Sequence, residues 1–285
     1  MTKKKPSIPI DHFGDEHSLG ISIEKVAVKD LLLFSEANEA HRHDFHSFFL
    51  LETGSVSMEI DFKKHNFQAP ALIYIHPNQV HLINAFKNVR VSTCAINNEN
   101  LHPGYLELLE SITPAKPLAL KKETYTIIRE AISLCLKFSE RRNDRLYYSL
   151  LKDSCNALVA LMISQYLERS KPADKLTRFE TVNKAFNSLL ERHYTTAKRP
   201  AEYAKKLNIS TSYLNECVNN TTGHSVSHQI QQRVILEAKR LLYHSGKSVK
   251  EIAAELGYDD YPYFSRLFTK VTGMPALAFR NKNHE

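Results

Sequence analysis

The chain has 285 residues, 42% of them hydrophobic, and a net charge of +7. This length fits two domains better than one, and each could bury a sizeable core. Its four cysteines show no paired spacing, which argues against a disulfide framework or a C-x-x-C zinc site. No stretch approaches the ~20 apolar residues of a membrane span and no signal region is visible, so we expect a cytoplasmic protein without a membrane contact.

The first part of the chain predicts an arm followed by a small β-domain. Residues 1–20 are polar and predict an arm with little structure of its own. From Ile21 to about Val91, apolar residues recur with period two and are interrupted by turn signals, among them Glu52-Thr-Gly54 and Asn88. We therefore expect several short antiparallel strands that form a sandwich or barrel.

Histidines are concentrated in this β-domain. The segment His41-Arg-His43-Asp-Phe45-His46 and the later His81 are similar to the two half-motifs of a cupin. Metal-binding cupins carry H-x-H-x3-E and a later histidine, but Ser47 replaces the glutamate here. Three imidazoles alone can hold a transition metal.

Loss of the carboxylate nevertheless favours histidines that contact a ligand or are satisfied inside the pocket, so we expect no metal and no cofactor. Period two places Phe45 with His41 and His43 on one face and His46 on the other. The residues expected to bind a small-molecule effector are His41, His43, Phe45, Tyr74 and His81.

Helical spacing replaces the period of two after Asn97. A short helix is expected from Leu101 to Ile112, and two longer amphipathic helices from Glu123 to about Arg141 and from Asp144 to Arg169. The long pair predicts a helical hairpin with one face for the barrel and another for a partner, although purely intramolecular packing is the alternative. We expect a sensor domain over 21–170, a polar linker over 171–177 and a second domain over 178–285.

The last segment contains the same pattern twice. Val249 to Gly273 predicts two short helices joined by a tight turn at Gly257, which is a helix-turn-helix. Ala201 to Gly223 repeats the scheme, and the segment between the copies reads as one helix that spans roughly 30 Å, close to the ~34 Å of one turn of B-DNA. Two recognition helices could therefore enter successive major grooves.

The apolar stripes predict which side chains would face DNA. Arg266 can donate twice to guanine, Asn215 can pair with adenine, and Lys270 can bind phosphate. Glu216 could accept from cytosine or simply pair with a lysine. The full set expected at the interface is Ser212, Asn215, Glu216, Asn219, Tyr261, Pro262, Ser265, Arg266, Thr269 and Lys270.

These residues carry a resemblance to a known family. The runs A-K-K-L-x-x-S-x-x-Y-L from Ala204, E-I-A-x-x-L-G-Y from Glu251 and Y-F-S-R-x-F-x-K from Tyr263 resemble the DNA-binding domain of AraC/XylS-type transcription regulators. Val218 departs from the usual phenylalanine of the first motif. The resemblance implies a cupin-like sensor domain and a dimer formed through residues 123–169. Charge agrees, because the chain from Arg178 onward has 16 Lys and Arg against 10 Asp and Glu.

The sequence thus predicts an α+β protein of two domains: a cupin-like β-barrel with a helical hairpin, and an all-α domain with two helix-turn-helix motifs. Its expected function is an effector-responsive, dimeric transcription regulator that binds promoter DNA, with RNA polymerase as a candidate partner. No enzyme is expected, since phosphate-loop and G-x-S-x-G motifs are absent from the sequence. Two alternatives stay open: a metal-dependent cupin enzyme with a DNA-binding anchor, and a regulator without an effector.

Overall fold

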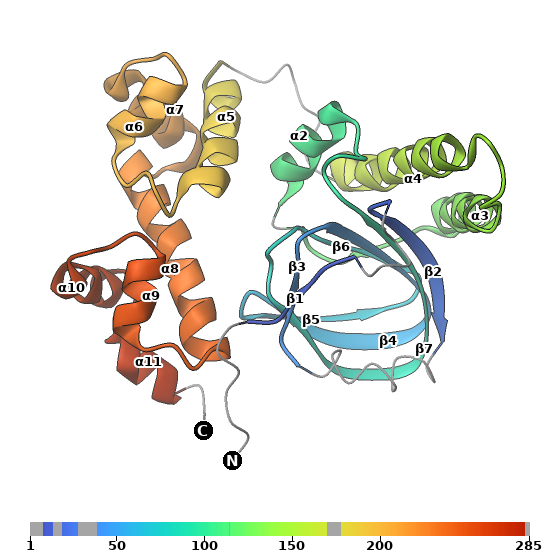
Figure 1. The fold of residues 1–285 in the computed structure, drawn as a ribbon, viewed down its shortest axis with the longest axis horizontal. Coiled ribbons are helices and arrows are strands. Elements are labelled where there is room, and N and C mark those ends of the chain that lie inside the picture. Colours follow the sequence, from blue (N-terminus) through green and yellow to red (C-terminus); the bar gives the residue numbers. More distant parts are fainter. Residues whose placement is uncertain (1–7, 14–18, 28–38, 114, 170–177, 283–285) are drawn as a thin grey trace. The chain divides into compact units, whose positions relative to one another are not determined.

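The structure is a computed structural model that describes residues 8–13, 19–27, 39–113, 115–169 and 178–282. Pro9–Pro172 form one compact unit, here the N-terminal unit, and Ala173–Glu285 with Met1–Ile8 form the other, here the C-terminal unit (Figure 1). The expected linker over 171–177 lies outside the described residues. None of the described helices is long and apolar enough to span a bilayer.

The N-terminal unit is built on one six-stranded sheet. Its strands follow the order β2-β7-β4-β6-β8, and β5 also pairs with β4. Their bounds are β2 Ile21–Ala27, β4 His46–Ile60, β5 Lys63–Gln68, β6 Ala71–Ile75, β7 His81–Ile96 and β8 Leu118–Ala119. A separate parallel pair joins β1 (Ile10–Asp11) to β3 (Arg42–His43). The sheet path is open, so the mixed fold is as predicted but a closed cupin barrel is not found among the described residues.

Two predicted strand breaks lie inside long strands. Strand β4 continues through Glu52-Thr-Gly54, and its pairing with β7 shifts register between Leu51 and Ser55. Strand β7 likewise continues through Asn88, which adopts a left-handed backbone with φ of 51°. The turn-forming residues therefore produce bulges, which bend a paired strand without ending it. Instead of several short strands, two long antiparallel strands form the centre of the sheet.

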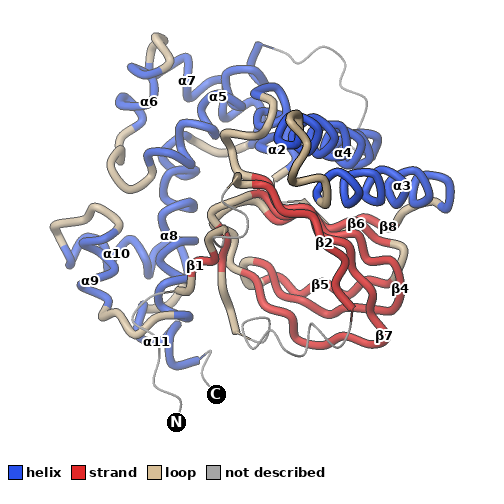
Figure 2. The backbone as a smooth tube through the Cα atoms, turned by 45° about the vertical axis from the view of Figure 1, so that its right-hand side comes forward, coloured by secondary structure: helices blue, strands red, loops and turns tan. Residues whose placement is uncertain are grey.

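The sheet has two differently covered faces. On one face, Phe48, Leu50, Leu72 and Tyr74 pack with the helices in a large core. These helices are α2 (Pro103–Ile112), α3 (Lys122–Ser139) and α4 (Tyr147–Arg169), and α3 and α4 form the expected hairpin (Figure 2). The alternate residues of the same strands point to the inner face, where they form a second core.

The C-terminal unit is all helix among its described residues 178–282. Its helices are α5 (Arg178–His193), α6 (Pro200–Lys206), α7 (Thr211–Thr222), α8 (Val226–His244), α9 (Val249–Glu255), α10 (Tyr261–Thr272) and α11 (Ala276–Lys282). The pairs α6–α7 and α9–α10 are the two expected helix-turn-helix motifs, at opposite ends of α8 (Figure 1). Only α11 was not anticipated as an element.

Helix α8 is tied to α5 through charged side chains. The Arg233 guanidinium lies 3.8 Å from the ring centroid of Tyr194 and donates to both carboxylate oxygens of Glu191. On its other side, Glu237 lies 3.6 Å from Arg233 and accepts a 2.7 Å hydrogen bond from Arg240. Both Glu237 and Arg240 are 3% exposed, so water cannot stabilise their charges and each is stabilised by its charged partner instead.

The turn of the second motif packs against the loop after α5. Gly257 has φ of 76°, and a Cβ placed there would lie 2.0 Å from the backbone oxygen of Thr195. Beside it, the Lys198 ammonium donates to the Leu256 carbonyl at 2.5 Å and lies 4.7 Å from the Tyr258 ring centroid. Burial lowers the pKa of Lys198 to about 8. The two motifs are thus held together by direct contacts as well as by α8.

We predict that Gly257→Ala destabilises the C-terminal unit far more than Gly273→Ala. Both glycines have a left-handed backbone, but a Cβ at Gly273 would meet nothing within 4 Å. Gly273→Ala should therefore cost only the conformational strain, about 1–2 kcal/mol. Gly257→Ala should add a steric cost of about 1–3 kcal/mol.

Urea unfolding of both full-length variants, followed by far-ultraviolet circular dichroism, measures this difference. Equal losses in the two variants would mean that the contact between Gly257 and Thr195 is absent.

Candidate nucleic-acid interface and ligand pocket

The two candidate recognition helices, α7 and α10, begin and end in the same way. Each has 12 residues. Ser210 caps α7 by accepting a hydrogen bond from the Tyr213 amide, and Asp260 caps α10 by accepting one from Tyr263. Each helix then ends at a left-handed glycine. The repeat seen in the sequence is therefore a repeat of local structure.

The buried faces of these helices leave the predicted interface residues on the outside. Phe264, Leu267 and Phe268 are at most 5% exposed, whereas Tyr261, Pro262, Arg266 and Lys270 are exposed and Ser265 and Thr269 are half-buried. In α7 the buried side chains are Leu214, Cys217 and Val218. The exposed or half-buried ones include all four predicted positions, Ser212, Asn215, Glu216 and Asn219.

Asn215 has a structural role that the sequence did not indicate. Its Oδ1 accepts a 3.1 Å hydrogen bond from the amide of Val226, the first residue of α8. Part of its hydrogen-bonding capacity is thus used inside the protein. Tyr213 is half-buried, and the Arg178 guanidinium lies 5.3 Å from its ring centroid.

The inner face of the sheet lines a partly open cavity of about 420 Å³. Most of its lining is apolar and comes from β4, β5 and β7, for example Met58, Phe67 and Val91. The polar lining includes His41, His43 and His81, and Phe45 lies beside them with its ring stacked 4.7 Å from that of His43. A pocket of this size and composition fits a small, largely apolar molecule with a polar end.

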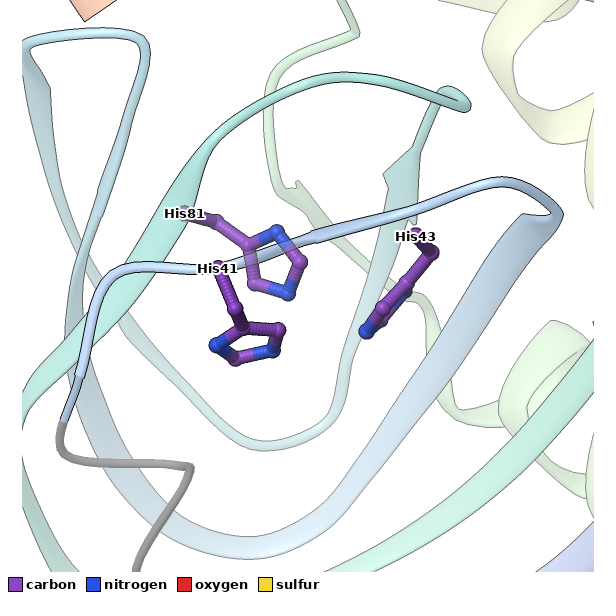
Figure 3. Close-up of side chains that lie close together, drawn as sticks. All are labelled: His41, His43 and His81. Carbon is purple, nitrogen blue, oxygen red and sulfur yellow. The ribbon is translucent and has the colours of Figure 1, made fainter. Parts of the chain in front are cut away.

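The three histidines converge. His41 and His81 form an isolated antiparallel bridge with two backbone hydrogen bonds, of 3.1 and 3.0 Å. The three side chains lie close together (Figure 3), and one ring nitrogen of each lies within 4.8 Å of one ring nitrogen of each of the others. Burial and the charge of neighbouring histidines lower the pKa of His43 to about 3 and that of His81 well below its usual value. His43 and His81 are therefore neutral near pH 7.

Two further residues complete the surroundings of the cluster. Ser47, at the position of the cupin glutamate, forms a 2.7 Å hydrogen bond with Nδ1 of His43. Asp11 was missed because it lies in the segment expected to be an unstructured arm. Its Oδ2 is 3.6 Å from Nε2 of His41 and 3.6 Å from Nε2 of His43. No motif in the sequence could have indicated this approach across some thirty intervening residues.

The structure corrects the prediction that Tyr74 lines the pocket. Tyr74 is 1% exposed and belongs to the core on the helix side of the sheet. Its hydroxyl forms a 2.8 Å hydrogen bond with Nδ1 of His46, which also lies away from the cavity. Alternation along β6 explains the error, because Ile73, one residue earlier, faces the cavity instead.

Comparison with known proteins matches residues 203–282 to a family described as a helix-turn-helix domain. The transcriptional activator RhaR of Mannheimia succiniciproducens is 19% identical over 268 residues, which are 93% of this chain and 95% of that protein. RhaR of Cronobacter sakazakii is 33% identical over 90 residues, 32% of this chain and 27% of its own length. Among solved structures, ToxT of Vibrio cholerae O395 covers 93% of this chain and 98% of its own at 13% identity, with a TM-score of 0.40.

The matched residues contain most of α6 and all of α7 to α11, the elements whose paired geometry is described above. Residues 203–282 thus form a helix-turn-helix domain, and the chain is similar over most of its length to a transcriptional activator.

Proposed function

We propose that the protein regulates transcription in response to a small molecule bound in the N-terminal unit, and that it does so as a dimer. The observation that carries the DNA-binding part is the paired construction of α7 and α10, each with an apolar face in the core and a polar face outside. Arg266 and Lys270 supply a guanidinium and an ammonium on the exposed face of α10. In this proposal, Arg266 reads a base and Lys270 holds a phosphate.

The cavity supports the effector part of the proposal. His41, His43, Phe45 and His81 would contact the polar end of the effector, and the apolar lining of β4 and β7 would contact its body. The effector would favour one of two arrangements of the dimer on DNA, which requires that it bind one arrangement more tightly than the other. No catalytic activity is included in this proposal.

Exposed apolar side chains on the helical hairpin support the dimer. Ile127 and Leu134, seven positions apart on α3, are 47% and 48% exposed, and Leu146 and Tyr148 near the start of α4 are 62% and 43% exposed. A spacing of seven residues places the first two on one helix face. This face would bind the same face of a second copy. Leu158, by contrast, is fully buried and unsuited to testing the interface.

We predict that Arg266→Ala weakens binding to the selected DNA site by about 1–3 kcal/mol and relaxes the preference at one base pair. Lys270→Ala should weaken binding to all sequences alike and reduce the slope of log affinity against log salt by about 1. Lys64→Ala, which removes an exposed charge from the N-terminal unit, is the matched control and should leave both quantities unchanged.

Fluorescence anisotropy with a duplex selected from a random library and with a scrambled duplex, at two salt concentrations, measures these effects. An Arg266→Ala protein that retains its full sequence preference would show that another face of α10 contacts DNA.

For the effector, we predict that filling the cavity abolishes ligand stabilisation. A compound that binds at one hundred times its Kd should stabilise the wild-type protein by about 2.7 kcal/mol. Ala95→Phe places a ring in the cavity lining, whereas Ala85→Phe makes the same change on the same strand outside it. A thermal-shift screen of the full-length proteins should give hits that Ala85→Phe keeps and Ala95→Phe loses. Hits that bind both variants equally would locate the effector elsewhere.

For the dimer, we predict that Leu134→Asp yields a folded monomer, because a charge would have to be buried in the apolar interface. Leu277→Asp changes a leucine that is 58% exposed in the C-terminal unit and should leave the assembly intact. Sedimentation velocity of both variants, with circular dichroism as a check of folding, tests this. A folded Leu134→Asp protein that remains dimeric would remove α3 from the interface.

A further inference from the structure

We propose that His41, His43, His81 and Asp11 form a binding site for one divalent first-row transition metal ion, in which the carboxylate comes from β1. This site goes beyond the proposed function, and it requires neither DNA binding nor the identity of the effector. The sequence argued against a metal because Ser47 stands where metal-binding cupins have glutamate. The structure supplies a different carboxylate at the same cluster.

The hydrogen bonds of the rings leave the right nitrogens for a metal. Nδ1 of His41 lies 2.9 Å from the carbonyl oxygen of Glu39, and Nδ1 of His81 lies 3.2 Å from that of Gln79. A carbonyl oxygen only accepts, so in these two rings Nδ1 carries the proton and Nε2 presents a lone pair.

In the third ring, Nδ1 of His43 lies 2.7 Å from the hydroxyl oxygen of Ser47, which can accept as well as donate. When the hydroxyl accepts, Nε2 of His43 presents a lone pair, as in the other two rings. Oxygen acceptors on the outer nitrogen are the usual second shell of metal-binding histidines, where they fix the tautomer and orient the ring. Ser47 therefore acts as a positioning residue for His43. A cation between three convergent nitrogen lone pairs would be stabilised by all of them.

Asp11 lies at a distance that suits a shared cation. Its separations of 3.6 Å from the two Nε2 atoms are too long for hydrogen bonds. Metal–ligand distances of about 2.1 Å in a tetrahedral site place neighbouring donor atoms about 3.4 Å apart. The observed spacing is therefore compatible with two ligands of one ion.

The backbone holds Asp11 at this position. Strand β1 pairs in parallel with β3, so that Asp11 stands opposite His43. The Arg42 amide donates to the Pro9 carbonyl at 3.1 Å, and the Asp44 amide donates to the Asp11 carbonyl at 3.4 Å. An ion at this site would join β1 to β3 and β7 through side chains as well.

Three imidazoles and one carboxylate define the class of metal. Imidazole suits zinc, copper, iron and nickel, and a carboxylate is compatible with each of them. Calcium and magnesium, which prefer oxygen ligands alone, are disfavoured. Zinc and cobalt(II) are suitable probes, because cobalt reports its coordination in the visible spectrum.

The full-length protein, stripped with a chelator, should be titrated with Zn²⁺ by calorimetry and with Co²⁺ by absorption spectroscopy. We expect a stoichiometry of one ion per chain and cobalt bands that disappear when zinc is added. His81→Gln should abolish binding, and Asp11→Asn should weaken it at least about 10-fold. Asp44→Asn removes a nearby carboxylate that pairs with His12 instead, so its affinity should equal that of the wild type.

A second measurement separates loss of the site from loss of the fold. Hydrogen–deuterium exchange should show that Zn²⁺ slows exchange at the amides of Arg42 and Asp44 in the wild type and in Asp44→Asn. The same amides should respond little in Asp11→Asn, whose far-ultraviolet circular dichroism should match the wild type.

The proposal is overturned if the wild type binds neither ion stoichiometrically, or if a folded Asp11→Asn protein binds zinc as tightly as Asp44→Asn does. DNA binding of the same samples, measured without metal, reports on the proposed function independently.

Discussion

The buried contacts of Arg233 determine how the C-terminal unit is assembled. Its guanidinium connects α8 both to Tyr194, just after α5, and to Glu191 within it. A charge removed from water is tolerated only with close partners, and the Arg233 side chain, which is 10% exposed, has Glu191 and Glu237 as such partners. Rotation or sliding of α8 against α5 would break all of these contacts together. Because α8 also leads into the second motif, its fixed position determines where that motif begins.

The distance between the two motifs follows from the length of the same helix. Its 19 residues extend roughly 28 Å at 1.5 Å per residue. The contacts of Lys198 with Leu256 and Tyr258 then hold the turn of the second motif against the loop before the first. The separation of the two candidate recognition helices thus depends on α8 and on these contacts. A fixed separation would restrict the protein to DNA sites with one spacing between half-sites.

The sequence predicted the C-terminal unit more fully than the N-terminal one, for a physical reason. Helices α7 and α10 can be predicted from residues that are close in the sequence. These are an N-terminal cap such as Asp260, an apolar stripe and a terminal glycine such as Gly273. The long strands cannot be predicted in this way. Gly54 and Asn88 are typical turn residues, but in the structure they lie inside paired strands, where the pairing is irregular. The site shows the same contrast: period two placed His41 and His43 on one face, but Asp11 reaches them only through pairing of β1 with β3.

The hydrogen bond from Val226 to Asn215 has a consequence for how DNA would be read. Folding already fixes the Asn215 amide, since Oδ1 is held at the start of α8. A free asparagine on a recognition helix would lose side-chain entropy when it met a base, and this loss weakens binding. The Asn215 side chain is already ordered in the folded protein, so it would lose less entropy on contact with a base. Its Nδ2, a hydrogen-bond donor, would then favour acceptor atoms on a base edge, which in the major groove are purine N7, guanine O6 and thymine O4.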